Sequence, residues 1–181
     1  MLRLINCTKS KKEISEKILG ADIIYVGGGN TLMMMTLWRK LGVDKILQQA
    51  YSKGIVLCGI SAGAICWCAY GNSDSRQFKN PEAQLIKVRG LGFIDVLLCP
   101  HYHSKKYGKG RRDSLKVMMQ KTSGVALAID DFCTLAFIDD QYKILRSKQN
   151  AHAYKVYWKQ KKFFHEKIDP DTTGYQKSLI R

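Results

Sequence analysis

Short apolar runs alternate with amphipathic stretches along this chain of 181 residues. The apolar runs are rich in β-branched residues and stop at glycine or polar residues, which is typical of buried parallel strands. These runs are residues 21–26, 54–59, 96–99 and 125–129. The stretches with helical periodicity are residues 13–19, 32–41, 43–52 and 112–121. Because a strand–helix–strand connection is right-handed with parallel strands, this order predicts an α/β fold, with αβα layers around a mostly parallel sheet.

Other segments complete this expectation. Residues 64–70 form an apolar run after the second strand and predict the opening of a buried helix. The polar residues 71–75 predict a turn, and residues 76–92 predict a long irregular stretch. Two β-hairpins are expected at residues 134–146 and 151–168, followed by a frayed tail.

The turn Gly59-Ile60-Ser61-Ala62-Gly63 joins the second strand to the apolar run that follows it. A G-x-S-x-G pattern between a strand and a helix is typical of a nucleophile elbow, in which the serine backbone is strained and its neighbours must be small. Gly59, Ala62 and Gly63 meet that steric requirement. The same pattern also fits a serine in a turn that only binds an anion at a helix N-terminus. We favour Ser61 as a nucleophile.

A second glycine-rich segment, Gly27-Gly28-Gly29-Asn30-Thr31, follows the first strand. Because neighbouring parallel strands end at the same edge of a sheet, we expect these glycines to lie beside Ser61. Three glycines after a strand would also fit a phosphate loop, but neither G-x-G-x-x-G nor a Walker lysine is present. A backbone N–H donor next to Ser61 is the simpler interpretation.

Ser61 needs a base, because a serine hydroxyl is a weak nucleophile at neutral pH. His101 leaves the end of the strand at 96–99 directly after a proline and is the first candidate. His103, two residues further on, is its rival. His152 and His165 fall in the last predicted hairpin and are expected on the surface.

A third group must hold the tautomer of the imidazole and stabilise its charged form. The sequence offers three carboxylates at ends of predicted segments, namely Asp74, Asp130 and Asp131. Their positions alone leave the choice open.

The composition is that of an ordinary globular chain, with 45% hydrophobic and 25% charged residues. We expect a single domain over residues 1–181 in the cytoplasm, because no apolar run approaches the ~20 residues of a membrane helix and the charged start is unlike a signal peptide. Most of the six cysteines lie in apolar segments and are expected to pack as small buried hydrophobes. No Cys or His pair at zinc spacing complements Cys66 and Cys68, so we expect no metal and no cofactor.

Lysine and arginine number 30 against 15 acidic residues, which gives a formal net charge of +15. Such an excess can attract nucleic acid. The positive charges gather only at residues 105–112 and 155–162, however, and no nucleic-acid-binding motif accompanies them. We interpret the charge as a cationic surface, and expect neither a nucleic acid nor a membrane as partner.

Four segments of the chain match a known pattern, namely Val26–Thr31, Gly59–Ala64, Pro100–Tyr102 and Ile129–Asp131. Together they resemble the peptidase E family of serine peptidases, which includes aspartyl dipeptidase and cyanophycinase. The resemblance covers about residues 13–146. It implies a fold similar to that of class I glutamine amidotransferases, with a serine where those enzymes carry a cysteine.

The resemblance also implies roles for individual residues. Ser61 corresponds to the nucleophile and His101 to the base. The backbone N–H groups of Gly29 and Ala62 correspond to the donors of the oxyanion hole.

The resemblance implies further roles around these residues. The acid of the family triad falls on Asp74, and Asp131 matches a further acidic position at the site. Asn30 and Arg112 correspond to substrate-binding residues, and Arg111 is the neighbouring alternative to Arg112. A cation there would receive an acidic side chain of the substrate.

Proteins of this family usually carry further strand–helix units ahead of the segment that opens this chain. We therefore expect either that the chain is a shortened product of a longer gene or that a partner covers the exposed sheet.

The expected function is that of a serine peptidase that hydrolyses short peptides through an acyl-enzyme, with Asp-X dipeptides preferred. The alternative is a catalytically inactive, truncated relative that acts as a binding or assembly module. An esterase of the α/β-hydrolase type shares G-x-S-x-G, but its histidine follows the acid late in the fold, whereas His101 precedes two hairpins. A short peptide is the expected partner, and formation of a homodimer is left open.

Overall fold

The N-terminal part is a strand–helix–helix–strand unit with one helix in front of it. The computed structural model describes residues 1–103, 110–170 and 173–180. The elements of this unit are α1 (Lys11–Leu19), β1 (Ile23–Val26), α2 (Thr31–Leu41), α3 (Val43–Ser52) and β2 (Val56–Gly59). β1 and β2 pair in parallel, from Ile23 beside Val56 to Val26 beside Gly59, as predicted.

Local signals set the ends of these helices. Ser10 and Glu13 form a reciprocal capping box, so α1 begins at Lys11, ahead of the predicted stretch. Gly42 adopts φ 70° after α2, a left-handed conformation that favours glycine and ends the helix. Both helical stretches predicted between β1 and β2 are confirmed.

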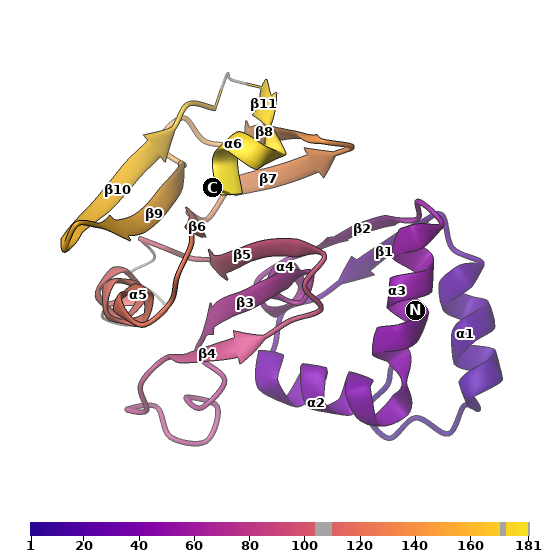
Figure 1. Ribbon diagram of the computed structural model, residues 1–181. Coiled ribbons are helices and arrows are strands. Elements are labelled where there is room, and N and C mark those ends of the chain that lie inside the picture. The colour runs from indigo at the N-terminus through magenta and orange to yellow at the C-terminus, as the bar shows by residue number, and fades with distance from the viewer. Residues whose placement is uncertain (104–109, 171–172, 181) are drawn as a thin grey trace.

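One face of the β1–β2 pair is covered and the other is not. α3 lies next to these strands and α1 lies next to α3 (Figure 1), and side chains of both helices belong to one apolar cluster with Ile24, Val26 and Leu57. Ile23 and Val56, which are register partners, are each more than half exposed. The prediction that both strands are buried therefore holds for one face only.

The segment after Ser61 differs from the prediction. α4 (Ala62–Ile65) is a single turn, and β3 (Cys68–Ser73) follows it, where we expected a longer helix and then a polar turn. An uninterrupted apolar run does not distinguish a helix from a strand by its periodicity, which is why the prediction failed. Gly71 lets β3 lie directly against α4, because a β-carbon there would overlap the side chain of Ile65.

The main sheet has six strands in the order β10-β9-β6-β5-β3-β4. The strands not yet named are β4 (Ile86–Arg89), β5 (Ile94–Cys99), β6 (Ala126–Ile129), β9 (Ala153–Lys159) and β10 (Lys162–Ile168). β3, β5 and β6 are parallel, whereas β4, β9 and β10 run antiparallel to their neighbours. The α/β class is confirmed, but the sheet is mixed rather than mostly parallel, because the predicted last hairpin joins it at β6. β4 also corrects the expectation of an irregular stretch at 76–92.

The C-terminal part adds a small third sheet in the order β11-β8-β7. It consists of β7 (Cys133–Ile138), β8 (Gln141–Arg146) and β11 (Thr173–Tyr175), with α6 (Gln176–Ile180) behind β11. Both predicted hairpins are confirmed. The expectation of a frayed tail is wrong for residues 173–180, because β11 pairs with β8 and Leu179 is buried.

Both faces of the central parallel strands are covered. Leu98 and Leu127 pack towards the C-terminal sheet, while Leu97 and Ala126 pack towards α5 (Arg111–Gln120). Because β5 and β6 pair in parallel, their carboxyl ends, and the polar residues that follow them, lie at the same edge of the sheet. None of the helices in the described part of the chain has the length and apolar character needed to cross a membrane.

Candidate active site

Ser61 lies in the tight turn between β2 and α4. Its backbone has φ 55° and ψ −115°, and such a sparsely populated conformation costs a non-glycine residue about 1–3 kcal/mol. A β-carbon on Gly59 would overlap the carbonyl of Gly63, and one on Gly63 would overlap the carbonyl of Val26. The two glycines therefore allow α4 to cross close to β1 and β2, which is the steric requirement of the elbow.

The glycine-rich loop after β1 lies next to Ser61. A β-carbon built on Gly28 would be 3.4 Å from Cβ of Ser61. Gly29 has φ +147°, which L side chains rarely adopt. Within the described residues, neither the N–H of Gly29 nor that of Ala62 donates a hydrogen bond. Both are available to a ligand in segments that adjoin Ser61.

The ends of β5 and β6 bring His101 and Asp131 together. Nδ1 of His101 contacts Oδ1 of Asp131, and the histidine side chain is 11% exposed. An ionised carboxylate can only accept a hydrogen bond, so Nδ1 carries the proton in this contact. In the neutral ring the lone pair is then on Nε2, as a general base towards a serine requires.

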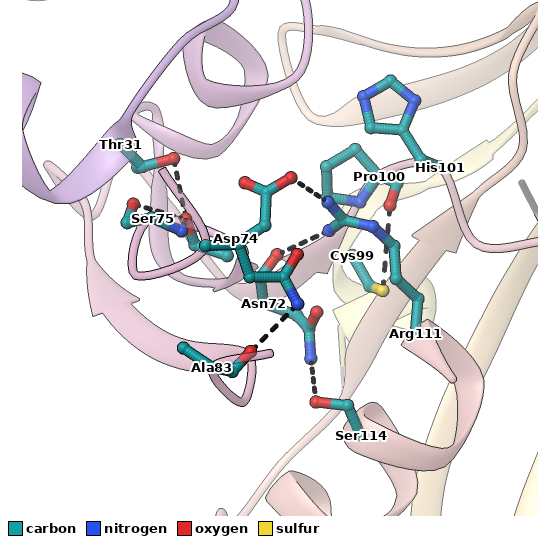
Figure 2. A network of polar contacts seen from close by, with 12 residues as sticks. Thr31, Asn72, Asp74, Ser75, Ala83, Cys99, Pro100, His101, Arg111 and Ser114 are labelled. Atoms are coloured by element: carbon teal, nitrogen blue, oxygen red, sulfur yellow. Dashed lines mark hydrogen bonds and ion pairs between the residues drawn. The ribbon is translucent and has the colours of Figure 1, made fainter. Parts of the chain in front are cut away.

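Asp74 points to Arg111 and not to a histidine (Figure 2). Nη2 of Arg111 donates to Oδ2 of Asp74 at 2.7 Å, and Nη1 donates to the backbone carbonyl of Asn72 at 3.2 Å. The arginine side chain is 3% exposed and that of Asp74 is 23% exposed. Of the carboxylates that the sequence left open, Asp74 thus pairs with a buried guanidinium and Asp131 with His101.

Asp130 pairs with the other candidate histidine. Nδ1 of His103 lies 2.9 Å from Oδ1 of Asp130. His152 and His165 are half-buried, so the expectation that they lie on the surface is only partly met. Burial lowers the pKa of both rings, and nearby cationic groups lower it further.

Asn30 caps α2 and ties it to the end of β3. Its Oδ1 accepts a hydrogen bond from the N–H of Met33 at 3.0 Å, and its Nδ2 donates to the carbonyl of Ser75 at 2.9 Å. Oγ of Ser73 donates to Oγ1 of Thr31 at 3.1 Å. Figure 2 shows this serine–threonine network beside the Asp74 pair and the loop after β5. These hydrogen bonds tie the start of α2 to the end of β3, and substrate binding by Asn30 stays a prediction.

The basic segment expected above the site is only partly described. Residues 104–109 lie outside the described residues, and Arg111 and Arg112 begin α5. Arg112 is exposed, and its charge acts on the pKa values of Tyr102, Tyr154 and His165. Of the two arginines, Arg112 presents its charge to solvent.

The reasoning from sequence missed the position of Arg111. A signal was present, because Arg111, Leu115 and Met119 recur at a spacing of four residues and are all buried on one face of α5. A buried arginine on such an apolar stripe needs a partner for its charge, and the half-buried Asp74 is that partner.

The described residues contain no group of three or more His, Cys, Asp or Glu side chains that could hold a metal ion. Cys66 and Cys68 are buried. Burial raises the pKa of Cys68 to about 12, so its thiol stays protonated at neutral pH. Both cysteines pack in the core, as predicted.

The comparisons with known proteins converge on peptidases. The uncharacterised peptidase YgaJ of Bacillus subtilis (strain 168) is 39% identical over 141 residues, which cover 77% of this chain and 57% of YgaJ. The uncharacterised peptidase PM1590 of Pasteurella multocida (strain Pm70) is 31% identical over 147 residues, 80% of this chain and 69% of PM1590. Residues 2–145 match peptidase family S51, and the chain belongs to this family, which confirms the resemblance stated above.

Two crystal structures have a similar fold. A peptidase from an acI-B1 Actinobacterium has a TM-score of 0.68 at 15% identity, over 92% of this chain and 64% of that protein. A Listeria monocytogenes EGD-e protein assigned to peptidase E has a TM-score of 0.60 at 23% identity, over 78% of this chain and 67% of that protein. The chain spans about half of the length of the curated relatives YgaJ, at 57%, and Lmo0363 of Listeria monocytogenes, at 49%.

Proposed function

We propose that this protein is a serine peptidase that hydrolyses short peptides. The observation that carries the proposal is the backbone of Ser61, at φ 55° and ψ −115°, in a turn whose flanking glycines have no room for a side chain. A turn that only binds an anion needs N–H groups but no strained serine. Strain of this kind persists where the surrounding structure enforces it, and it is concentrated at functional sites.

The contact between His101 and Asp131 supports the assignment of a base and its orienting acid. In the proposed mechanism Oγ of Ser61 bonds to the scissile carbonyl carbon while Nε2 of His101 accepts the hydroxyl proton. The Asp131 carboxylate holds Nδ1 and stabilises the imidazolium. Among the described residues, Oγ of Ser61 has no hydrogen-bond partner. The proposal therefore assigns the Ser61–His101 hydrogen bond to the substrate complex, in which such bonds tighten.

Two backbone donors complete the proposed reaction. The N–H groups of Gly29 and Ala62 would donate to the oxyanion of the tetrahedral intermediate, and each such donor lowers the barrier by about 3–4 kcal/mol. The bond between carbon and nitrogen then breaks as His101 gives its proton to the leaving amine. Water, deprotonated by the same histidine, hydrolyses the acyl-enzyme and releases Ser61.

We propose further that an acidic residue before the scissile bond is preferred. Arg112 supports this, because it is exposed at the start of α5, which follows the segment that carries His101. A guanidinium binds a carboxylate through two parallel hydrogen bonds. The formal charge of +15 also favours acidic substrates over basic ones.

A fluorophosphonate probe tests the proposed nucleophile. We expect one probe molecule per chain, attached to Ser61, and no attachment in Ser61→Ala. Circular dichroism of both proteins shows whether the variant keeps its fold. Absence of labelling in the folded, unaltered protein would contradict the peptidase and favour the inactive binding module.

A further inference from the structure

A second histidine–carboxylate pair lies next to the proposed catalytic pair. Nδ1 of His103 is 2.9 Å from Oδ1 of Asp130, and the two side chains are 42% and 12% exposed. Asp130 precedes Asp131, and His103 lies two residues after His101. The loop after β5 and the loop after β6 are therefore joined at two neighbouring points, which restricts their relative movement more than one contact does.

The last hairpin holds the Asp130 carboxylate from its other side. Oδ2 of Asp130 accepts a hydrogen bond from the backbone N–H of His152 at 3.1 Å, and the hydroxyl of Tyr154 lies 3.5 Å away. The backbone N–H of Asp130 donates to the carbonyl of His152 at 3.0 Å. Asp130 is thus fixed to the start of β9 independently of Asp131.

Four rings pack around this second pair and form a cluster of Tyr102, His103, Tyr154 and His165. Every pair of these rings has a centroid distance between 4.4 and 6.0 Å. Burial lowers the pKa of His165 and raises that of Tyr154 to about 12, so these two stacked rings are neutral at neutral pH. The ring cluster connects the histidine loop to both strands of the β9–β10 hairpin.

The backbone at His101 shows why this support is needed. His101 has φ 57°, a left-handed conformation that is uncommon for a residue other than glycine. The next residue, Tyr102, is 2% exposed, and its N–H donates to the carbonyl of Ile129 at 3.1 Å. An unfavourable backbone conformation persists only when neighbouring contacts enforce it, and the ring cluster provides contacts of that kind directly after His101.

We propose that Asp130 and His103 are positioning residues, which hold the loop after β5 so that Nδ1 of His101 stays on Asp131. This inference rests on the proposed function, because it gives the second pair a role in placing the base. Neither side chain is assigned a contact with substrate. A base displaced by about 1 Å can lower the rate by roughly a hundred-fold, so a loss of placement is measurable without a loss of fold.

The test compares Asp130→Asn and His103→Ala with Asp139→Asn, a matched control that removes an exposed carboxylate in the turn between β7 and β8. The first readout is the strongly downfield NMR signal of the His101 Nδ1 proton, identified by its disappearance in Asp131→Asn. The second readout is the rate at which a fluorophosphonate labels Ser61.

We expect Asp130→Asn and His103→Ala to weaken or broaden the NMR signal and to slow labelling by about ten- to a hundred-fold. Asp139→Asn should change neither. His103→Asn should retain more of the NMR signal and of the labelling rate than His103→Ala, because its amide nitrogen can replace Nδ1 of His103 as the donor to Asp130. His101→Ala, in contrast, should abolish labelling.

The proposal is overturned if the signal and the labelling rate in Asp130→Asn and His103→Ala equal those of Asp139→Asn. Since His103 is partly exposed, its variants keep the test valid if Asp130→Asn does not fold. Absence of the downfield signal from the unaltered protein would also overturn it. A protein that shows the signal but is never labelled would contradict the proposed function, and the NMR comparison would still decide the role of the second pair.

Discussion

His101 and Asp131 contact each other across two parallel strands, although they are 30 residues apart in the chain. Asp74, the other carboxylate considered for the same histidine, is occupied by Arg111 at 2.7 Å. The two acids therefore have different partners of different chemistry. Substituting each of them should have different consequences.

Asp131→Asn is expected to lower kcat by on the order of 10³–10⁴-fold, because an amide can donate to Nδ1 and hold the wrong tautomer of His101. Asp74→Asn is expected to act mainly on stability, because it leaves the Arg111 charge buried without its carboxylate. Since Asp74 is 23% exposed, the loss of unfolding free energy should be about 1–3 kcal/mol. Steady-state kinetics and urea unfolding of both variants separate the two effects.

The outcome that contradicts this assignment is equally definite. If Asp74→Asn loses activity as severely as Asp131→Asn while its unfolding midpoint is unchanged, Asp74 is the triad acid.

The glycines of the turn around Ser61 give a second prediction. Gly63→Ala should destabilise the protein by about 3 kcal/mol or more, at the upper end of overpacking costs, because its β-carbon would overlap the backbone of Val26. Gly27→Ala is the matched control, since a β-carbon there meets nothing within 4 Å. Its unfolding free energy should change by about 0.5 kcal/mol or less. Equal urea midpoints for the two variants would show that α4 does not cross as closely as described.

Residues with local signals were predictable from the sequence. Gly42 ends α2 because a glycine can adopt the left-handed conformation at that point, and this needs no knowledge of the rest of the fold. The closeness of Gly28 to Ser61 follows from two parallel strands that end at one edge. Signals of this kind depend on the residue type at one position and on the order of strands and helices along the chain.

Other features depend on the packing of distant segments. The first half of β3, Cys68–Tyr70, belongs to the apolar run 64–70, whose lack of a period does not distinguish a strand from a helix. Its second half, Gly71–Ser73, has the polar composition of a turn, and it is a strand because it pairs with β4 and β5. The choice between Asp130 and Asp131 turns on the directions of two adjacent side chains, which the main chain of β6 and the start of β9 determine together. Sequence reasoning could bring both carboxylates to the site but could not assign their partners.

The reactivity of the cysteines tests how closely the core is packed. Iodoacetamide at pH 8 should leave Cys66, Cys68, Cys99 and Cys133 unmodified in the folded protein, because all four are buried. The thiolate is the reactive species, and burial raises the pKa of Cys68 and Cys99 to about 12, so these thiols stay protonated well above pH 8. In about 8 M urea, which unfolds most domains of this size, all six cysteines should be modified.

Mass spectrometry of tryptic peptides reads the result. The half-buried Cys7 and Cys58 serve as internal references for the native reaction. Modification of Cys68 as fast as that of Cys7, without unfolding, would contradict the packing of β3 described above.

The last prediction concerns specificity and uses the contrast between the two adjacent arginines. Arg112 is exposed, whereas Arg111 is buried on Asp74 and Asn72. If Arg112 receives the acidic side chain of the substrate, Asp-X dipeptides should be cleaved faster than Asn-X dipeptides, which differ in charge but hardly in shape. A hydrogen bond to a charged group contributes ~1.5–3 kcal/mol, which corresponds to a preference of roughly ten- to a hundred-fold.

Arg112→Lys should lose most of this preference, because an ammonium group cannot donate two parallel hydrogen bonds. A fluorophosphonate carries no carboxylate, so its reaction with Ser61 should not depend on Arg112. Arg111→Lys is the matched control: it should lower the melting temperature, because the bond to Asn72 or to Asp74 is lost, and leave the ratio of Asp-X to Asn-X unchanged. Ratios of kcat/KM for the two dipeptides measure the effect, and equal values in the unaltered protein would contradict the acidic preference without touching the role of Ser61.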